Sequence, residues 1–296
     1  MTDRRKAKLG PYAFILPTII VVVVFWLIPI GKAFLLTLTN AQLLAIGNAK
    51  YIGFANYAKF FSGSDLLSIM KATLIYVIFG VGATYLVGLL AATMVNRDFW
   101  GKGVARALLI LPWMVPQVVL VIIWKWMLNP KYGIINFVLA HLGILPENFS
   151  WFGNGSFAMV AILIATIWKE YPLAMLILLA GMKSIPNEIY DAASVDGANA
   201  FQTFLRITLP SLRFVTTILV LLLTIWHFGN FVIIWLMTQG GPGNATATLT
   251  VFTYLNAFKF GDLGYGATIG MVIMVVTLGI SIAYYHIFIK RTEASA

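Results

Sequence analysis

Six long apolar runs constrain this chain more than any other feature of its sequence. They cover about residues 12–39, 69–96, 104–128, 156–183, 212–237 and 266–289. Each run is long enough to cross roughly 30 Å of hydrocarbon as an α-helix. Pro17 and Pro29 lie inside the first run, where a surrounding bundle tolerates them as kinks. We therefore predict an all-α fold, a polytopic membrane bundle of six transmembrane helices.

The composition agrees with this prediction. Hydrophobic residues make up 60% of the 296 residues and charged residues only 10%, with a mean hydropathy of +0.91. A soluble protein needs charged side chains at roughly a quarter of its positions, so lipid must solvate much of this surface. Every gap between apolar runs is shorter than a usual domain. Residues 1–296 are therefore expected to form a single transmembrane domain.

The N-terminal MTDRRKAKLG is basic and precedes the first apolar run. It resembles the start of a signal peptide, but the run is long and no small-residue cleavage site follows, so we predict an uncleaved anchor. An even number of spans places both termini on one side of the membrane.

Basic residues predict which side that is, because they are enriched in cytoplasmic connections. The termini and the connections on their side hold 12 of the 20 Lys and Arg residues, among them Arg4, Arg5, Arg206, Lys290 and Arg291. The opposite connections hold 7 of them. We expect cytoplasmic termini and a cytoplasmic segment 184–211. The net charge of +10 then reflects orientation and does not indicate a nucleic-acid partner.

Segment 184–211, SIPNEIYDAASVDGANAFQTFLRITLPS, reads as two short amphipathic helices. Pro186 suits a first helical position, and Glu188 lies in the first turn, where the helix dipole favours its charge. Gly197 permits a positive-φ break, and Pro210 is expected to end the second helix. The pattern fits a covering lid as well as a docking element. A DNA-reading helix pair is disfavoured, because acidic residues offset the basic ones and leave no basic face.

Two spans contain polar side chains, which are costly in lipid and should face a cavity or a partner. Lys169 and Glu170 are adjacent in the fourth span. They line a polar path or pair with other helices. In the fifth span His227 and Asn230 share a helix face beside Trp226. Aromatic rings next to hydrogen-bonding groups suit a sugar, although an interhelical structural histidine fits as well.

Small residues offer close approach of helices in two spans. They are Gly80, Gly82, Ala83 and Gly88 in the second span, with Gly266 and Gly270 in the sixth. Such patterns occur at helix interfaces. We interpret them as packing within one subunit in preference to a dimer face.

Signals for an enzyme are missing from the sequence. No phosphate-binding GxxxxGK[ST] motif occurs, so the chain is not expected to hydrolyse ATP by that route. The three histidines are scattered, no Ser-His-acid set can be proposed and there is no cysteine. We predict no catalytic residue and no metal site.

One motif resembles that of a known family. Residues 191–198, DAASVDGA, are followed by ITLP at 207–210, which is similar to the cytoplasmic EAA loop of permease subunits of bacterial ABC importers, particularly the carbohydrate-uptake branch. Asp191 stands where that family usually has Glu, which keeps the charge on a shorter side chain. The opening apolar run, YIGFANYAKFF and MTQGGPG also resemble the sugar-permease pattern, so the resemblance covers almost the whole chain.

The resemblance implies a transporter subunit of the bacterial inner membrane with no chemistry of its own. It implies that the loop 184–211 docks on a separate ATP-hydrolysing subunit through Glu188, Asp191, Ala192, Ala193, Asp196, Gly197 and Ala198. It also implies a second permease chain, two ATP-binding subunits that bind ATP and Mg, and an extracytoplasmic solute-binding protein. The solute is expected to be a sugar or oligosaccharide, with Lys169, Glu170, Trp226, His227 and Asn230 bordering its path.

Three other functions stay open at this point. A secondary transporter needs no ATPase, but we see no internal repeat of the kind common in that class. A channel needs no energy source, but no filter-like segment is visible. A structural membrane scaffold would not depend on the loop 184–211 for transport.

Overall fold

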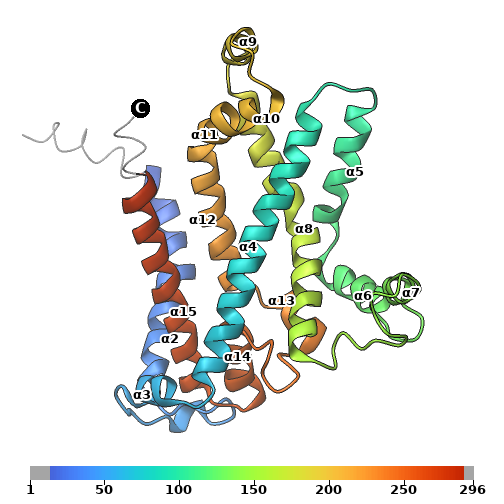
Figure 1. The fold of residues 1–296 in the computed structure, drawn as a ribbon. Helices are drawn as coiled ribbons and strands as arrows, with labels where there is room; N and C mark the ends of the chain where they lie inside the picture. The colour runs from blue at the N-terminus through green and yellow to red at the C-terminus, as the bar shows by residue number, and fades with distance from the viewer. Residues whose placement is uncertain (1–13, 290–296) are drawn as a thin grey trace, which may run out of the picture. The chain divides into compact units, whose positions relative to one another are not determined.

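A computed structural model describes residues 14–289. The predicted cytoplasmic termini, including Arg4, Arg5, Lys290 and Arg291, lie outside the described residues. The chain divides into two compact units, Met1–Leu66 with Thr253–Val272 and Leu67–Phe252 with Ile273–Ala296. The described residues are almost entirely helical, with β-pairing confined to two isolated bridges. This confirms the all-α prediction (Figure 1).

Four continuous helices are long and apolar enough to cross a membrane. They are Phe14–Thr37, Leu66–Asn96, Gly155–Lys183 and Leu263–Ile287. The first includes a π-helical turn at Val23–Leu27 and α2 (Ile28–Thr37), and the second and third are α4 and α8. The fourth comprises α15 (Leu263–Tyr284) and the start of a π-helical turn at Tyr285–Ile289. These helices overlap the apolar runs 12–39, 69–96, 156–183 and 266–289.

The run 104–128 is not one straight helix. It consists of α5 (Lys102–Met114) and α6 (Gln117–Met127), which meet at an angle of 98°. Pro116 explains the break, because it lacks an N–H and its ring pushes the preceding residue into extended backbone. Val115 accordingly has φ −68° and ψ 125°. The predicted third span therefore consists of two helices that together pass the length and composition test for one broken span.

The run 212–237 is also interrupted. α12 (Arg213–Gly229) and α13 (Val232–Thr238) are separated by Asn230 and Phe231. Asn230 has φ −72° and ψ 121°, outside the helical region. α12 ends at Gly229, a residue type that weakens a helix. Both interruptions leave backbone polar groups inside the span, which is tolerated only where they are buried in protein or line a cavity.

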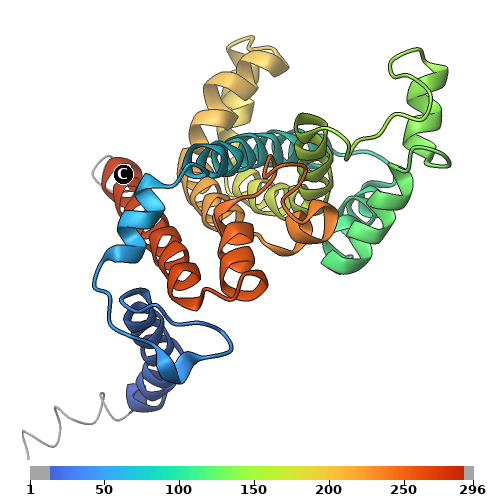
Figure 2. The same ribbon diagram turned by 90° about the horizontal axis from the view of Figure 1, so that it is seen from below.

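Within the second unit, α4, α8 and α12 pack closely because α4 has small residues at the contacts (Figures 1 and 2). A Cβ on Gly80 would lie 2.5 Å from the His227 ring, and a Cβ on Gly88 would lie 2.6 Å from the Cβ of Ala174. Gly82, in contrast, has nothing within 4 Å of that position. Gly80 and Gly88 therefore support the interpretation of packing within one subunit.

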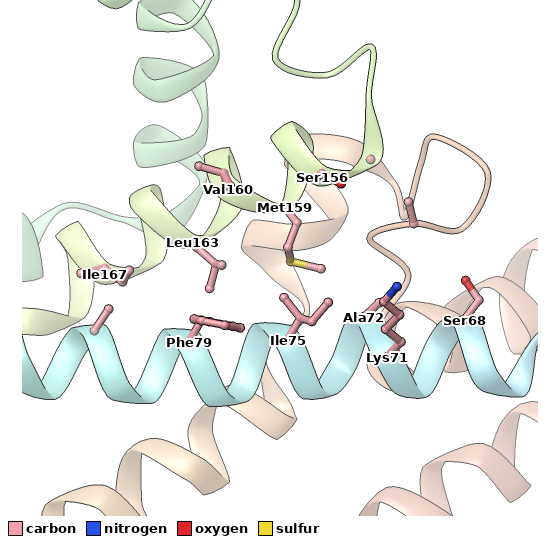
Figure 3. A pocket seen from close by; sticks show the side chains of 13 residues that line it. Ser68, Lys71, Ala72, Ile75, Phe79, Ser156, Met159, Val160, Leu163 and Ile167 are labelled. Carbon is pink, nitrogen blue, oxygen red and sulfur yellow. The ribbon is translucent and has the colours of Figure 1, made fainter.

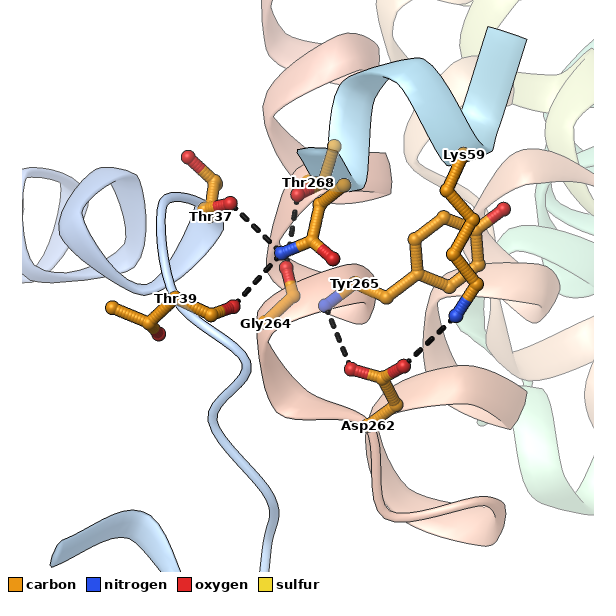
Figure 4. Close-up of polar contacts among 8 residues, drawn as sticks. Thr37, Thr39, Lys59, Asp262, Gly264, Tyr265 and Thr268 are labelled. Carbon is orange, nitrogen blue, oxygen red and sulfur yellow. Dashed lines mark hydrogen bonds and ion pairs between the residues drawn. The ribbon is translucent and has the colours of Figure 1, made fainter. Parts of the chain in front are cut away.

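The first unit is held together by polar contacts around Asn56 and Asp262 (Figure 4). The Asn56 amide donates to the backbone oxygens of Thr37 and Thr39, at 2.9 Å each. Asp262 accepts from Lys59 Nζ at 3.0 Å and from the Tyr265 N–H at 3.1 Å. Asn56 and Lys59 belong to α3 (Ala55–Ser62), so these bonds fix that short helix to the rest of the unit.

Segment 184–211 forms the predicted pair of helices. The first is α9 (Asn187–Val195), and Gly197 then takes φ +75°. The second begins with a capping box between Asn199 and Gln202 and comprises α10 (Ala200–Thr203), a π-helical turn at Phe204–Thr208 and α11 (Leu209–Ser211).

Pro210 does not end the second helix as expected. It lies in the first turn of α11, where its missing N–H leaves no donor unpaired, and the preceding π-helical turn changes the hydrogen-bond register there. The bend of 67° follows after Ser211.

The remaining elements are short. They are a 3₁₀ turn at Ile46–Asn48, α7 (Ile134–His141), α14 (Leu249–Tyr254) and a π-helical turn at Leu255–Lys259.

Candidate functional site

A cavity of about 350 Å³ lies where both interrupted spans meet the continuous helix α8. We call it the Glu170 cavity, and its lining residues are Gln117, Glu170, Ile225, Trp226, Gly229, Asn230, Phe231 and Val232. Gln117 is the first residue of α6 after the Pro116 break, and Asn230 and Phe231 form the break between α12 and α13. Interrupted helices that line a cavity within the membrane are typical of solute sites in transporters.

The Glu170 cavity lies beside the middle of α8. Glu170 is 15 residues after Gly155 and 13 residues before Lys183, the two ends of α8. At 1.5 Å per residue, both ends are about 20 Å away. Glu170 is therefore far from both ends of this membrane-spanning helix.

Glu170 faces His227 across the helix interface. Glu170 Oε2 lies 3.5 Å from His227 Nδ1, while the same Nδ1 is 2.9 Å from the Leu223 backbone oxygen. The His227 ring is buried and lies 5.2 Å from the Tyr76 ring, centroid to centroid. His227 is thus held between α4, α8 and α12. It contacts Glu170 but does not itself line the cavity.

Three buried polar atoms at this place have no hydrogen-bond partner among the described residues. They are Glu170 Oε2, His227 Nε2 and Asn230 Oδ1. An unpaired buried polar atom is destabilising unless a ligand or water completes it. Glu170 and Asn230 line the cavity, so a solute there could donate hydrogen bonds to their oxygens.

Lys169 has a different role from that of its neighbour. Its ammonium group donates to the backbone oxygens of Trp113 at 2.9 Å and Val115 at 2.8 Å. These carbonyls lie at the end of α5, where the Pro116 break leaves them without helical donors. Of the two sequence interpretations, Lys169 thus fits pairing with another helix, whereas Glu170 borders the cavity.

Gln117 was missed by the sequence reasoning. It is a polar residue within an apolar run and directly follows Pro116. A polar group next to a helix-breaking residue inside a span is the signal that could have identified it. Gln117 lies near Glu170 because of the bend between α5 and α6, which sequence spacing does not predict.

A second, larger hollow of about 560 Å³ lies between α4 and α8. Figure 3 shows apolar side chains from both helices facing each other, among them Ile75, Phe79 and Leu163, with Ser68 and Lys71 near one end. An apolar wall leaves the hydroxyl groups of a hydrated solute without partners. The Glu170 cavity is therefore the better candidate for a polar solute, although it is the smaller of the two.

Comparison with known proteins identifies the family. Residues 84–293 match the family described as binding-protein-dependent transport system inner membrane component. The chain belongs to this family. It is a membrane-spanning permease subunit of a binding-protein-dependent ABC importer.

Relatives match this permease over almost its full length. The trehalose/maltose transport system permease protein of Thermococcus litoralis is 36% identical over 283 residues, covering 96% of this chain and 94% of the relative. The sulfoquinovosyl glycerol transport system permease protein of Agrobacterium fabrum is 33% identical and covers 94% and 88%. A crystal structure of a bacterial alginate ABC transporter contains a chain with the same fold, with a TM-score of 0.83, 22% identity and coverage of 95% and 94%.

The permease presents segment 184–211 at the end of α8 that is opposite to α13 (Figure 1). Of the residues that the family resemblance singles out, Glu188, Asp191, Ala192, Asp196 and Gly197 are exposed. Ala198 is half-buried, and Ala193 is buried and accepts a backbone hydrogen bond from Ala198 at 2.9 Å. Ala193 and Ala198 therefore fix the bend, whereas the acidic residues are available to a partner.

Apolar side chains accompany these acids on the surface. Val195 is 88% exposed and Phe201 70% exposed. The Tyr190 hydroxyl lies 3.2 Å from the Thr208 hydroxyl and connects α9 to the second helix of the pair. Segment 184–211 is therefore a projection whose two helices are linked by a hydrogen bond, here called the braced projection. Its surface is apolar and acidic.

No metal centre is evident between residues 14 and 289, because no group of three or more His, Cys, Asp or Glu side chains there could hold an ion.

Proposed function

We propose that this permease forms half of the translocation pathway for a sugar or oligosaccharide, which passes through the Glu170 cavity. The observation that supports this most strongly is the convergence of Glu170, Trp226 and Asn230 on one cavity, which lies beside the helix breaks at Pro116 and Asn230. All three are among the five residues that the sequence predicts along the solute path.

The side chains suit a saccharide. Trp226 is 42% exposed and offers an apolar face to a sugar ring, while Phe231 provides a second aromatic group. Glu170 Oε2 and Asn230 Oδ1 lack donors, and sugar hydroxyls would supply them. The relatives named for trehalose/maltose and sulfoquinovosyl glycerol transport support a carbohydrate as the solute.

We propose that energy reaches the pathway through segment 184–211, which docks on a separate ATPase. ATP and Mg are then bound by two partner subunits, and this chain binds neither. A braced projection can transmit a rigid-body movement to α8 and α12, which it joins. Its exposed Glu188, Asp191 and Asp196 would orient the contact, while Val195 and Phe201 would provide apolar area.

The remaining partners follow from the same proposal. A second permease chain completes the pathway, and an extracytoplasmic solute-binding protein delivers the solute. We propose that both termini and segment 184–211 are cytoplasmic, which the distribution of Lys and Arg in the sequence supports.

The test of the pathway is solute uptake by the complete importer in proteoliposomes. Trp226→Ala is expected to change solute preference or raise the KM, because it removes the stacking surface but leaves the complex intact. Trp100→Ala is the matched control, since Trp100 is fully exposed outside the cavity. If Trp226→Ala transports with unchanged kinetics, α12 does not border the pathway.

Dependence on a separate ATPase is tested in the same proteoliposomes. Uptake that persists undiminished without nucleotide would contradict the proposed coupling.

A further inference from the structure

We infer that the Glu170 cavity selects neutral, hydroxyl-rich saccharides over anionic ones, and that Glu170 is the residue that determines this selection. The inference rests on the proposed pathway and adds the charge class of its solute.

The charge of the cavity wall is the first argument. Glu170 is the only ionisable residue among the eight lining residues, and no Lys or Arg lines the cavity. Anion recognition in proteins normally uses Arg, Lys or clustered backbone N–H groups. The wall described here offers no cationic side chain to a carboxylate, sulfonate or phosphate.

The nearest cation is committed elsewhere. Lys169 directly precedes Glu170 in the sequence, but its ammonium group donates to the Trp113 and Val115 backbone oxygens at 2.9 and 2.8 Å. Turning it toward the cavity would break both hydrogen bonds and leave the end of α5 uncapped. Lys169 is therefore not available as a counter-charge for an anionic solute.

The groups behind Glu170 include no Lys or Arg. His227 Nδ1 lies 3.5 Å from Glu170 Oε2, but the same atom is 2.9 Å from the Leu223 backbone oxygen and the ring is buried. The Tyr76 hydroxyl is engaged with the Thr166 hydroxyl at 3.2 Å. An ionised carboxyl group repels a second ionised acid.

The unpaired atoms are the second, independent argument. Glu170 Oε2 and Asn230 Oδ1 are both buried oxygens that lack a donor. A neutral saccharide brings hydroxyl donors that complete them, whereas an anionic group brings additional acceptors. Specificity of this kind combines favourable contacts for one solute with repulsion of another.

The experiment measures direct binding to the purified importer complex in nanodiscs, without the solute-binding protein, so that the selectivity of that protein does not contribute. The two probes are maltotriose and a trisaccharide of uronic acids, which have the same length. Isothermal titration calorimetry at neutral pH measures the affinity of the complex for each probe. The unaltered complex is expected to bind maltotriose at least about tenfold more tightly, corresponding to about 1.4 kcal/mol.

Glu170→Gln removes the charge and keeps the shape, so the ratio of the two affinities is expected to fall to within about threefold. Asn230→Asp adds a second acid and is expected to widen the ratio. Glu147→Gln is the matched control, because Glu147 is exposed outside the cavity, and it should leave the ratio unchanged. Gel filtration of each complex verifies assembly.

Two results would overturn the inference in different ways. If Asn230→Ala weakens maltotriose binding, but the unaltered complex binds the uronic trisaccharide as tightly as maltotriose, the charge selection is wrong and the pathway stands. Both the selection and the saccharide pathway are wrong if neither probe binds the unaltered complex. They are also wrong if Asn230→Ala, Asn230→Asp and Glu170→Gln all leave the affinity for both probes unchanged.

Discussion

Gly80 shows how one missing side chain positions a buried group beside the Glu170 cavity. The His227 ring occupies the space in which a Cβ on Gly80 would lie, at 2.5 Å. Because His227 in turn contacts Glu170, the shape of α4 influences the cavity without lining it. Residues of this kind determine geometry through packing alone.

We expect Gly80→Ala to destabilise the complex by about 1–3 kcal/mol, because overpacking must displace His227. Gly82→Ala is the matched control on the same helix, where the added methyl group meets nothing within 4 Å. Thermal unfolding of the purified complex measures the difference. Equal melting temperatures for the two variants would show that Gly80 is not tightly packed.

Lys169 illustrates a second residue-scale effect, the capping of a broken helix by a charged side chain. Lys169→Met approximately keeps the length of the side chain but removes its two hydrogen bonds to the end of α5. Hydrogen bonds to charged groups contribute about 1.5–3 kcal/mol, so a clear loss of thermal stability is expected. Lys131→Met, at an exposed position, is the control. A variant at position 169 that melts like this control would exclude the capping role.

At the scale of elements, the breaks in the spans matter more than the spans themselves. Hydropathy predicted the apolar runs, because about 20 apolar residues in sequence are a strong signal. It did not predict the 98° bend at Pro116, since a proline in a bundle is compatible with anything from a mild kink to a full break. Which outcome occurs depends on neighbours such as Lys169, and these are tertiary contacts.

Segment 184–211 was easier to predict because its signals are local. Gly197 takes positive φ as expected, because glycine has this backbone freedom. Pro186 is the N-cap residue of α9, one position before the first helical position predicted for it. Pro210 was misjudged, because a π-helical turn upstream accommodates it. For the cavity, chemistry identified Glu170, Trp226 and Asn230, but only the fold could separate Glu170 from Lys169.

The bend at Gly197 allows a specific test of coupling. Gly197→Val forces a β-branched residue to φ +75°, which is unfavourable by about 1–2 kcal/mol, so the bend should distort and solute-stimulated ATPase activity of the complex should fall. Gly197→Asn is the matched control, because Asn tolerates positive φ and nothing lies within 4 Å of the added Cβ. If both variants keep normal stimulation, the bend is not needed for coupling.

At the scale of the whole molecule, orientation in the membrane connects all of these assignments. The chain has no cysteine, so single introduced thiols report sidedness without background. Val195→Cys, on the 88% exposed Val195 position, should react with a membrane-impermeant maleimide only after the cytoplasmic side is opened. Leu44→Cys, at a position that is 99% exposed, should react from outside in intact cells. The reverse pattern would contradict a cytoplasmic segment 184–211.

The central claim is that solute movement through this permease is driven by a separate ATPase acting on segment 184–211. The most direct measurement is solute uptake into proteoliposomes that contain the complete importer, compared with proteoliposomes that lack only the ATPase subunits. The account predicts uptake that requires both ATP and those subunits. Equal uptake in their absence would contradict it.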